Sequence, residues 1–206
     1  MTKVLYIIRH GQTDLNLGGI VQGRGIDAPL NATGLRQADA FYGAYKDEGF
    51  DHIYTSNLQR THQTVGKFVH DGIPLQPLEG LDEISWGIYE GKEQSPEIIT
   101  GFERLVSAWR RGELDVAVEK GESPIQLIER QRLAMDYILA REDERKVLIC
   151  MHGRAMRILL SWFTGGDASQ MDDFPHTNTS LYKVLVEGAR REIIDAYNIE
   201  HLSELR

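Results

Sequence analysis

Two continuous apolar stretches of this chain each lead into a histidine followed by a glycine. Residues 4–8 precede Arg9-His10-Gly11, and residues 147–151 precede His152-Gly153. Short apolar runs separated by helical patterns are typical of parallel strands that are buried on both faces of a sheet. The carboxyl ends of parallel strands lie at one edge, which is where open α/β sheets bind ligands. We therefore expect both histidines at the same edge of a parallel sheet.

Strand and helix patterns alternate along the rest of the sequence. Strands are expected at 3–8, 51–55 and 146–151, and a terminal hairpin at 180–186 and 191–197. Helices are expected at 34–47, 57–70, 96–112, 124–141 and 154–164. Thr33 is expected to cap the first of these helices. Ser56 and Gln59 have the spacing of a capping box, which predicts a helix start beside Arg60.

This order of elements predicts an α/β fold with three layers, α/β/α, around a mostly parallel central sheet. The C-terminal hairpin would add an antiparallel edge. We expect a single domain, residues 1–206, in which residues 92–121 form a helical cap over the active edge of the sheet.

The composition limits the partners and the compartment. A net charge of −8 at pH 7 argues against nucleic acid and against an anionic membrane, since both require a broad basic face. No apolar run approaches the roughly 20 residues that cross a bilayer, and Met1-Thr2-Lys3 leads into a strand without a secretory leader. The single cysteine, Cys150, fits a reducing compartment. We therefore expect a cytoplasmic protein.

The residues at the two strand ends are suited to phosphate chemistry. Arginine presents a planar fork of donors that matches a phosphate group, and neutral histidine is a nucleophile near neutral pH. Arg9 and His10 supply this pair, while His152 and Arg60 supply a second imidazole and a second cation. Together they predict an anion pocket. The alternative for His152 is a hydrogen-bonded core histidine, and the alternative for Arg60 is a solvated helix residue.

A metal site is the main rival chemistry for these histidines. The sequence contains no His-x-His, His-Glu-x-x-His or paired-cysteine spacing. We therefore expect neither a metal ion nor another cofactor.

The chain resembles the histidine phosphatase superfamily, also called the phosphoglycerate mutase-like fold, and its phosphatase branch in particular. The resemblance covers nearly the whole length and rests on several separate segments. These are Arg9-His10-Gly11-Gln12-Thr13 with Asn16; Gln22-Gly23 with Asp27, Pro29-Leu30 and Gly34; Ser56, Leu58, Arg60 and Thr64; Leu81, Glu83, Gly87, Glu90 and Gly91; Gly121-Glu122-Ser123 with Arg130; and His152-Gly153 with Arg157. Matches this numerous, in this order, are highly specific.

The resemblance implies a role for each charged residue of the pocket. His10 would be the nucleophile that forms a phosphohistidine, and Glu83 the general acid that protonates the leaving alkoxide. Arg9, Arg60 and His152 would hold the equatorial phosphate oxygens, where charge spreads in the transition state.

Neutral groups would complete the phosphate site. The resemblance implies Asn16 as a neutral donor and Gln22 as a further contact. Glycine lets a backbone N–H group approach a ligand closely, which is the role implied for Gly23 and Gly153.

Several positions stay open at this stage. Asp82 and Glu90 lie near Glu83 and are alternative acids. Arg154 departs from the small or neutral residue that many relatives have there; it would contact a phosphate or carboxylate, or point outward. His176 lies in a segment where the family places substrate contacts, with a surface position as the alternative. One arginine of the Arg110-Arg111 pair would contact a charged group at the far end of the substrate, or the pair would complement a helix dipole.

These residues predict an enzyme, a histidine acid phosphatase-type phosphomonoesterase acting on a small phosphorylated metabolite. One alternative is a cofactor-dependent phosphoglycerate mutase-type phosphotransferase, although mutases of this fold usually carry a longer insert than residues 91–121. Another is a non-enzymatic phosphate-ligand sensor or scaffold on the same fold. The sequence fixes neither the substrate nor the oligomeric state, for which a homodimer is one option.

Overall fold

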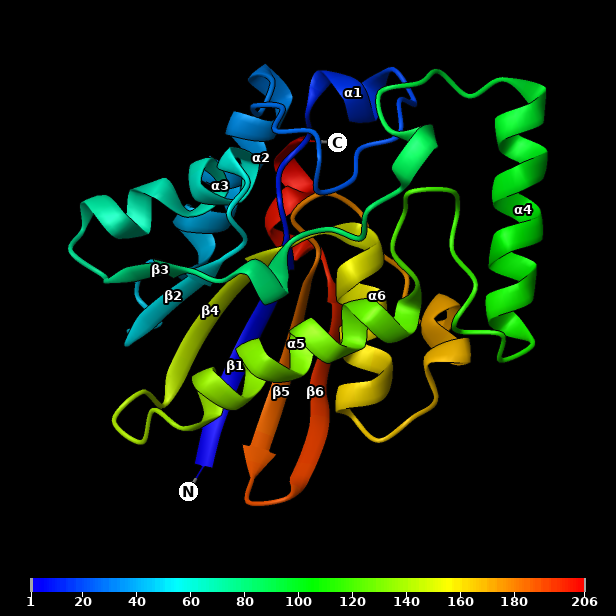
Figure 1. The fold of residues 1–206 in the computed structure, drawn as a ribbon. Helices are drawn as coiled ribbons and strands as arrows, with labels where there is room; N and C mark the ends of the chain where they lie inside the picture. Colours follow the sequence, from blue (N-terminus) through cyan, green and yellow to red (C-terminus); the bar gives the residue numbers. More distant parts are fainter. Residues whose placement is uncertain (1, 206) are drawn as a thin grey trace.

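A computed structural model describes residues 2–205, whose centre is a mixed six-stranded sheet with the order β3-β2-β4-β1-β5-β6 (Figure 1). The strands are β1 (Thr2–Arg9), β2 (His52–Thr55), β3 (Leu75–Pro77), β4 (Lys146–Met151), β5 (Leu181–Glu187) and β6 (Arg190–Asn198). Strands β1 to β4 are parallel, whereas β5 is antiparallel to both β1 and β6. The expected α/β fold with a hairpin at its edge is confirmed.

Helices cover both faces of this sheet. They are α1 (Asp14–Leu17), α2 (Ala32–Tyr45), α3 (Gln59–His70), α4 (Pro96–Arg110), α5 (Pro124–Leu139) and α6 (Gly153–Phe163), with short 3-10 helices η1 (Glu79–Leu81), η2 (Gly87–Tyr89), η3 (Ala168–Asp173) and η4 (Glu200–Leu205). Successive side chains of a strand point to opposite faces. Leu5 and Ile7 of β1 therefore pack in the core with α4, α5 and α6, whereas Tyr6 and Ile8 pack with α2 and α3. No helix within residues 2–205 is long and apolar enough to span a membrane.

Polar side chains cap the starts of both α2 and α5. The prediction for α2 is wrong, because its N-cap is Asn31, whose side chain accepts the Gly34 N–H, and not Thr33. Helix α5 begins at Pro124 as expected, and its N-cap is a capping box in which the side chains of Ser123 and Gln126 each accept the other residue's backbone N–H.

The capping box expected at Ser56 is also wrong. Helix α3 begins at Gln59, and its N-cap, Leu58, makes no side-chain capping bond. The Ser56 hydroxyl accepts the Leu58 N–H at 3.1 Å and lies 2.8 Å from Nε2 of His152. The Ser56 side chain therefore bonds to His152 at the sheet edge and does not cap the helix.

Helix α4 stands at one side of the fold, where loops connect it to the rest of the molecule (Figure 1). Trp109 at its C-terminal end is almost fully buried, and its indole N–H donates to the Val116 carbonyl at 2.8 Å. Nearer the middle of α4, the ring of Phe102 lies 5.2 Å from that of Trp86. These aromatic contacts attach α4 to the main core and place its inner face beside the active edge of the sheet.

Candidate active site

The carboxyl ends of three neighbouring strands meet at one edge of the sheet. Strands β2, β4 and β1 lie side by side, and they are followed by Ser56, His152 and His10 respectively. The His10 N–H continues the ladder by donating to the Met151 carbonyl at 3.0 Å. The two imidazole rings have centroids 5.1 Å apart, so the chain brings both histidines to the same edge.

His10 is held as a neutral imidazole. Its Nδ1 lies 2.7 Å from the Gly11 carbonyl oxygen, which can only accept, so Nδ1 carries the proton. Burial lowers the pKa of His10 well below its ordinary value, and the charges of Arg9 and Arg60 lower it further. The lone pair is therefore on Nε2 of a ring that lines the cavity, which is the state in which an imidazole is nucleophilic.

Both ring nitrogens of His152 already have partners. Arg60 Nε donates to Nδ1 at 3.2 Å, so Nε2 carries the proton and donates to Ser56 Oγ at 2.8 Å. Burial, together with the charge of Arg60, lowers the pKa of His152 well below its ordinary value. His152 lies behind the cavity wall, where it orients Arg60. Its direct contact with phosphate stays a prediction.

Arg60 is fully buried and lines the cavity. Its Nη1 donates to the Ile26 carbonyl at 2.7 Å, and its Nε donates to His152 as described. Burial lowers the pKa of this guanidinium, while Glu83 and other carboxylates oppose the shift. The alternative of a solvated helix residue is therefore wrong, and the binding of an anion by Arg60 stays a prediction.

Arg9 is oriented by a neutral histidine and not by a carboxylate. Its Nη1 donates to Nδ1 of His176 at 3.1 Å. Burial lowers the pKa of His176 to about 3, and the charge of Arg9 contributes. Burial also lowers the pKa of Arg9 to about 10, which leaves the guanidinium charged at neutral pH. A neutral partner fixes the guanidinium without cancelling its charge, so that charge is available to an anion.

Glu83 caps the N-terminus of α6 across the chain. Its Oε1 accepts the backbone N–H groups of Ile84 (2.9 Å) and Ala155 (2.8 Å), and its Oε2 accepts that of Arg154 (3.1 Å). The first N–H groups of a helix have no partner within the helix, so the carboxylate is fixed by three donors. It also lines the cavity with His10.

The two alternative acids, Asp82 and Glu90, accept backbone N–H groups outside the cavity. Asp82 accepts the Asn57 N–H at 2.8 Å, and Glu90 accepts the Trp86 N–H at 2.9 Å. Neither carboxylate belongs to the cavity wall, whereas Glu83 does. The geometry therefore favours Glu83 among the three.

The predicted neutral contacts Asn16 and Gln22 both line the cavity. Asn16 Oδ1 accepts the Thr13 N–H at 3.1 Å, which leaves its amide N–H₂ group for a ligand on that side. Gln22 Nε2 donates to Thr13 Oγ1 at 2.8 Å. One threonine thus orients both amides.

The two predicted glycines occupy different places. Gly153 lines the cavity, and a Cβ there would lie 2.6 Å from the ring of His176, so only glycine allows this packing. Gly23 lies outside the wall and packs against Glu90, where a Cβ would overlap the carboxylate. Its carbonyl accepts from Arg60 Nη2 at 3.5 Å, so its place is beside the arginine.

The cavity at this edge has a volume of about 300 Å³. Beyond the residues above, its wall is formed by Val21, Trp86, Gln94, Phe102 and Arg154. Gln94 and Phe102 come from the expected cap, residues 92–121. Within residues 2–205, no group of three or more His, Cys, Asp or Glu side chains is arranged to hold a metal ion, and the arginine-rich wall suits an anion instead.

Sequence reasoning missed the supporting role of Asn178 and misread that of Ser56. Asn178 Nδ2 donates to the His10 carbonyl at 3.0 Å, which holds the backbone of His10 in place. Thr64, which belongs to the resembling motif, accepts the Gly11 N–H at 3.0 Å. The polar run before β5 was the only signal for Asn178, and its contact spans 168 positions.

Comparisons with known proteins identify the family of this chain. Residues 5–199 match the family model of the histidine phosphatase superfamily, branch 1. A probable phosphoglycerate mutase, GpmB, of Proteus mirabilis is 32% identical over 168 residues, which cover 78% of this chain and 74% of that protein.

Solved structures show the same fold. Bacillus stearothermophilus YhfR superimposes with a TM-score of 0.84 at 26% identity, covering 98% of this chain and 100% of that one. A mycobacterial glucosyl-3-phosphoglycerate phosphatase gives 0.84 at 22% identity, covering 97% and 100%. The chain belongs to the histidine phosphatase superfamily.

Proposed function

We propose that this protein is a phosphomonoester hydrolase that works through a phosphohistidine on His10, with Glu83 as general acid and base. The observation that carries the proposal is the hydrogen bond from His10 Nδ1 to the Gly11 carbonyl. It leaves the Nε2 lone pair toward a cavity whose wall contains the partly buried Arg9 and the fully buried Arg60.

The reaction has two steps. Nε2 of His10 attacks phosphorus, the Nε2–P bond forms as the ester P–O bond breaks, and Glu83 gives its proton to the departing alkoxide. Water then attacks the phosphohistidine, Glu83 takes a proton from that water, and the Nε2–P bond breaks to release phosphate. Arg9 and Arg60 stabilise the charge on the equatorial oxygens in both steps.

The proton on Glu83 needs a source, because in this structure its carboxylate oxygens accept three backbone N–H groups. A phosphomonoester has a second pKa of about 6, so its monoanion is populated near neutral pH. Binding of that monoanion beside Glu83 brings the proton into the site. Once transferred, the proton is positioned for the leaving oxygen.

The direct test is His10→Ala assayed with p-nitrophenyl phosphate. Loss of the nucleophile is expected to lower kcat by on the order of 10³-fold or more. His70→Ala, whose side chain is 91% exposed, is the matched control. The wild-type protein should also carry acid-labile phosphate after brief exposure to substrate. Retention of most of the activity in His10→Ala would contradict the mechanism.

The names of the relatives favour a second candidate, a phosphoglycerate mutase-type transfer. Both reactions share the first step and differ in whether water or a sugar-acid hydroxyl accepts the phosphoryl group. The cap, residues 92–121, reaches the wall only through Gln94 and Phe102, which favours access by water. Faster isomerisation of 3-phosphoglycerate than release of phosphate would establish the mutase instead.

A further inference from the structure

Arg154 is a cavity residue that the proposed reaction does not use. Its backbone N–H binds Glu83, while its side chain joins Phe102 and Gln94 in the cavity wall. The side chain is 10% exposed, so this guanidinium is largely removed from bulk water. A buried charge of this kind requires compensation from neighbours or from a ligand.

Two aromatic rings and one carboxylate fix the position of this guanidinium. Its Cζ lies 5.9 Å from the ring centroid of Phe102 and 5.8 Å from that of Trp109, within the range of cation–π attraction. Its Nη1 donates to Asp172 Oδ1 at 2.8 Å. Within residues 2–205, that is the only hydrogen bond of the side chain, so Nε and Nη2 of Arg154 still have donors to offer.

Asp172 does not neutralise Arg154, because three arginines share its carboxylate. Arg157 Nη1 donates to the same Oδ1 at 2.7 Å, and Arg110 Nε donates to Oδ2 at 2.9 Å. Although burial opposes it, the arginines lower the pKa of Asp172. One negative charge among three positive ones leaves a local positive surplus, in a chain whose net charge is −8.

The charges of the cavity wall predict the charge of its ligand. The wall contains Arg9, Arg60 and Arg154 as cations and Glu83 as its carboxylate. When Glu83 holds the proton that the first step requires, three positive charges remain. A bound phosphoryl dianion would pair with Arg9 and Arg60, and the unused donors of Arg154, which shares Asp172 with two other arginines, favour a further negative group on the same ligand.

We propose that Arg154 binds a carboxylate carried by the alcohol part of the substrate. This inference rests on the proposed hydrolase function and narrows its substrate class to small phosphomonoesters of hydroxy acids. A guanidinium edge meets a planar carboxylate with two parallel hydrogen bonds, and the aromatic rings beside it keep that edge oriented. The cavity volume of about 300 Å³ is at the lower end for ligand sites, which suits a small substrate.

The test compares two esters that differ in this group, 3-phosphoglycerate and glycerol 3-phosphate. The ratio of their kcat/KM values is measured for the wild-type protein, Arg154→Met and Arg154→Lys. We expect the ratio to fall about tenfold or more in Arg154→Met, since a charge-assisted pair is lost. Arg154→Lys keeps the charge without the fork, so it should retain part of the preference.

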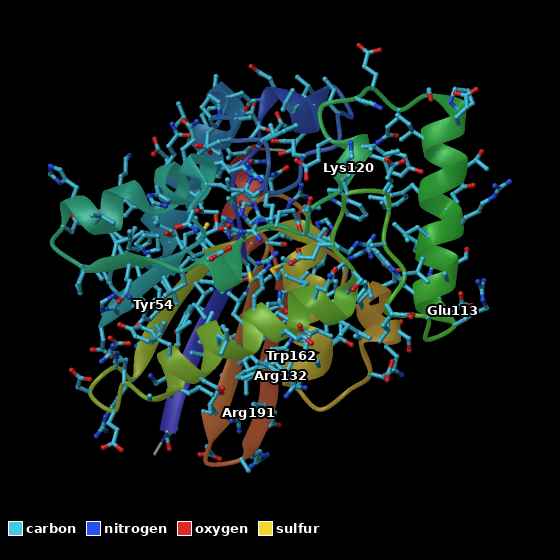
Figure 2. All side chains as sticks on the ribbon, viewed as in Figure 1. Tyr54, Glu113, Lys120, Arg132, Trp162 and Arg191 are labelled. Atoms are coloured by element: carbon cyan, nitrogen blue, oxygen red, sulfur yellow. The ribbon has the colours of Figure 1, made fainter. Side chains whose placement is uncertain are left out.

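Arg132→Met is the matched control. Arg132 lies over the ring of Trp162 at 5.0 Å (Figure 2), so it too is an arginine on an aromatic ring. It does not line the cavity, and its substitution should leave the ratio as it is in the wild-type protein. An equal loss for both esters in Arg154→Met would overturn the proposal, as would an unchanged ratio.

A binding measurement separates this inference from the proposed function. Dissociation constants for both esters are measured calorimetrically on His10→Asn and on the double variant with Arg154→Met. If the wild-type protein releases no phosphate from any ester, the hydrolase proposal fails, and the ratio of dissociation constants still decides the role of Arg154. An equal ratio in the two variants would overturn that role.

Discussion

His10, Glu83 and Arg60 each bond to main-chain groups, whereas the guanidinium of Arg154 is held by other side chains. His10 donates to a carbonyl, Glu83 accepts three backbone N–H groups, and Arg60 donates to a carbonyl at 2.7 Å. Arg154 is oriented by Asp172 and by two aromatic rings. The end of the cavity formed by His10, Arg60 and Glu83, where we propose that phosphate binds (the phosphate end), is thus anchored to the main chain, and the end formed by Arg154 is not.

This difference suggests that the groups near His10 determine the rate of the reaction, whereas the groups near Arg154 determine which esters are preferred. Groups anchored to the ends of β1 and β4 move only if the sheet moves, so their geometry survives substitutions elsewhere. Side chains from α4 and η3 are replaceable without changing the sheet. Variants at the phosphate end should therefore affect all esters, and variants at the other end should change the ranking of esters.

Among variants that test the difference between the two ends, Glu83→Gln should lower the reaction rate most. Glu83 lines the cavity with His10 and also accepts the backbone N–H of Arg154. Glutamine keeps the shape but has no proton to give, so hydrolysis of an alkyl phosphate should slow by about 10²–10⁴-fold. Nitrophenolate leaves without protonation, so the first-turnover release of nitrophenol from p-nitrophenyl phosphate should slow much less. Rapid-mixing kinetics with both esters measures the difference.

Glu90→Gln is the control for this prediction. Glu90 also accepts backbone N–H groups, from Trp86 at 2.9 Å and from Gly25 at 3.0 Å, yet it is outside the cavity wall. Its substitution changes loop anchoring without removing the proposed acid. Equal slowing of alkyl and nitrophenyl esters in Glu83→Gln would assign Glu83 a structural role only.

A smaller effect is expected for Arg60→Met, which tests the phosphate end alone. The loss of one buried donor to the phosphoryl oxygens should lower kcat/KM by about 10²–10³-fold. Every ester should lose the same factor, in contrast to Arg154→Met, because all esters share the phosphoryl group. The measurement is kcat/KM for the two esters above, with Arg132→Met alongside. A loss that depends on the leaving group would break the distinction between the two ends.

The sequence was sufficient to predict the elements whose structure follows from local residue patterns. Continuous apolar runs predicted β1 and β4, and the helical pattern of residues 124–141 predicted α5. The short elements α1 and β3 were not predicted, since segments of this length, one of them ending in Pro77, carry no measurable periodicity.

Contacts between distant segments explain the remaining differences. Ser56 carries a valid local capping signal, but His152, 96 positions away, engages its hydroxyl. The pairing of Arg154 with Asp172 depends on how η3 lies against α6, which no local pattern encodes. The position of His10 and His152 at one edge was predictable because the ends of parallel strands converge, whereas the pairing of side chains farther along the cavity was not.

The smallest expected effect is on the pH dependence of folding stability. It concerns His176, the neutral histidine that orients Arg9 at the phosphate end. The ordinary pKa of histidine is about 6.5, and burial lowers that of His176 to about 3 in the folded chain. Below about pH 6.5 the unfolded chain therefore binds a proton that the folded chain does not. The stability that this group contributes is present above that pH and is lost progressively as the pH falls toward 3.

His176→Asn removes that titration while an amide oxygen can still accept from Arg9. Between about pH 6 and about pH 4, the free energy of unfolding should fall less steeply, by about 1.4 kcal/mol per pH unit. Urea unfolding at a series of pH values measures this slope. In His70→Asn the slope should match the wild-type protein, because that side chain is 91% exposed and meets water in both states. An identical slope in His176→Asn would mean that His176 takes up its proton in the folded chain, and Arg9 would then face a cation instead of a neutral acceptor.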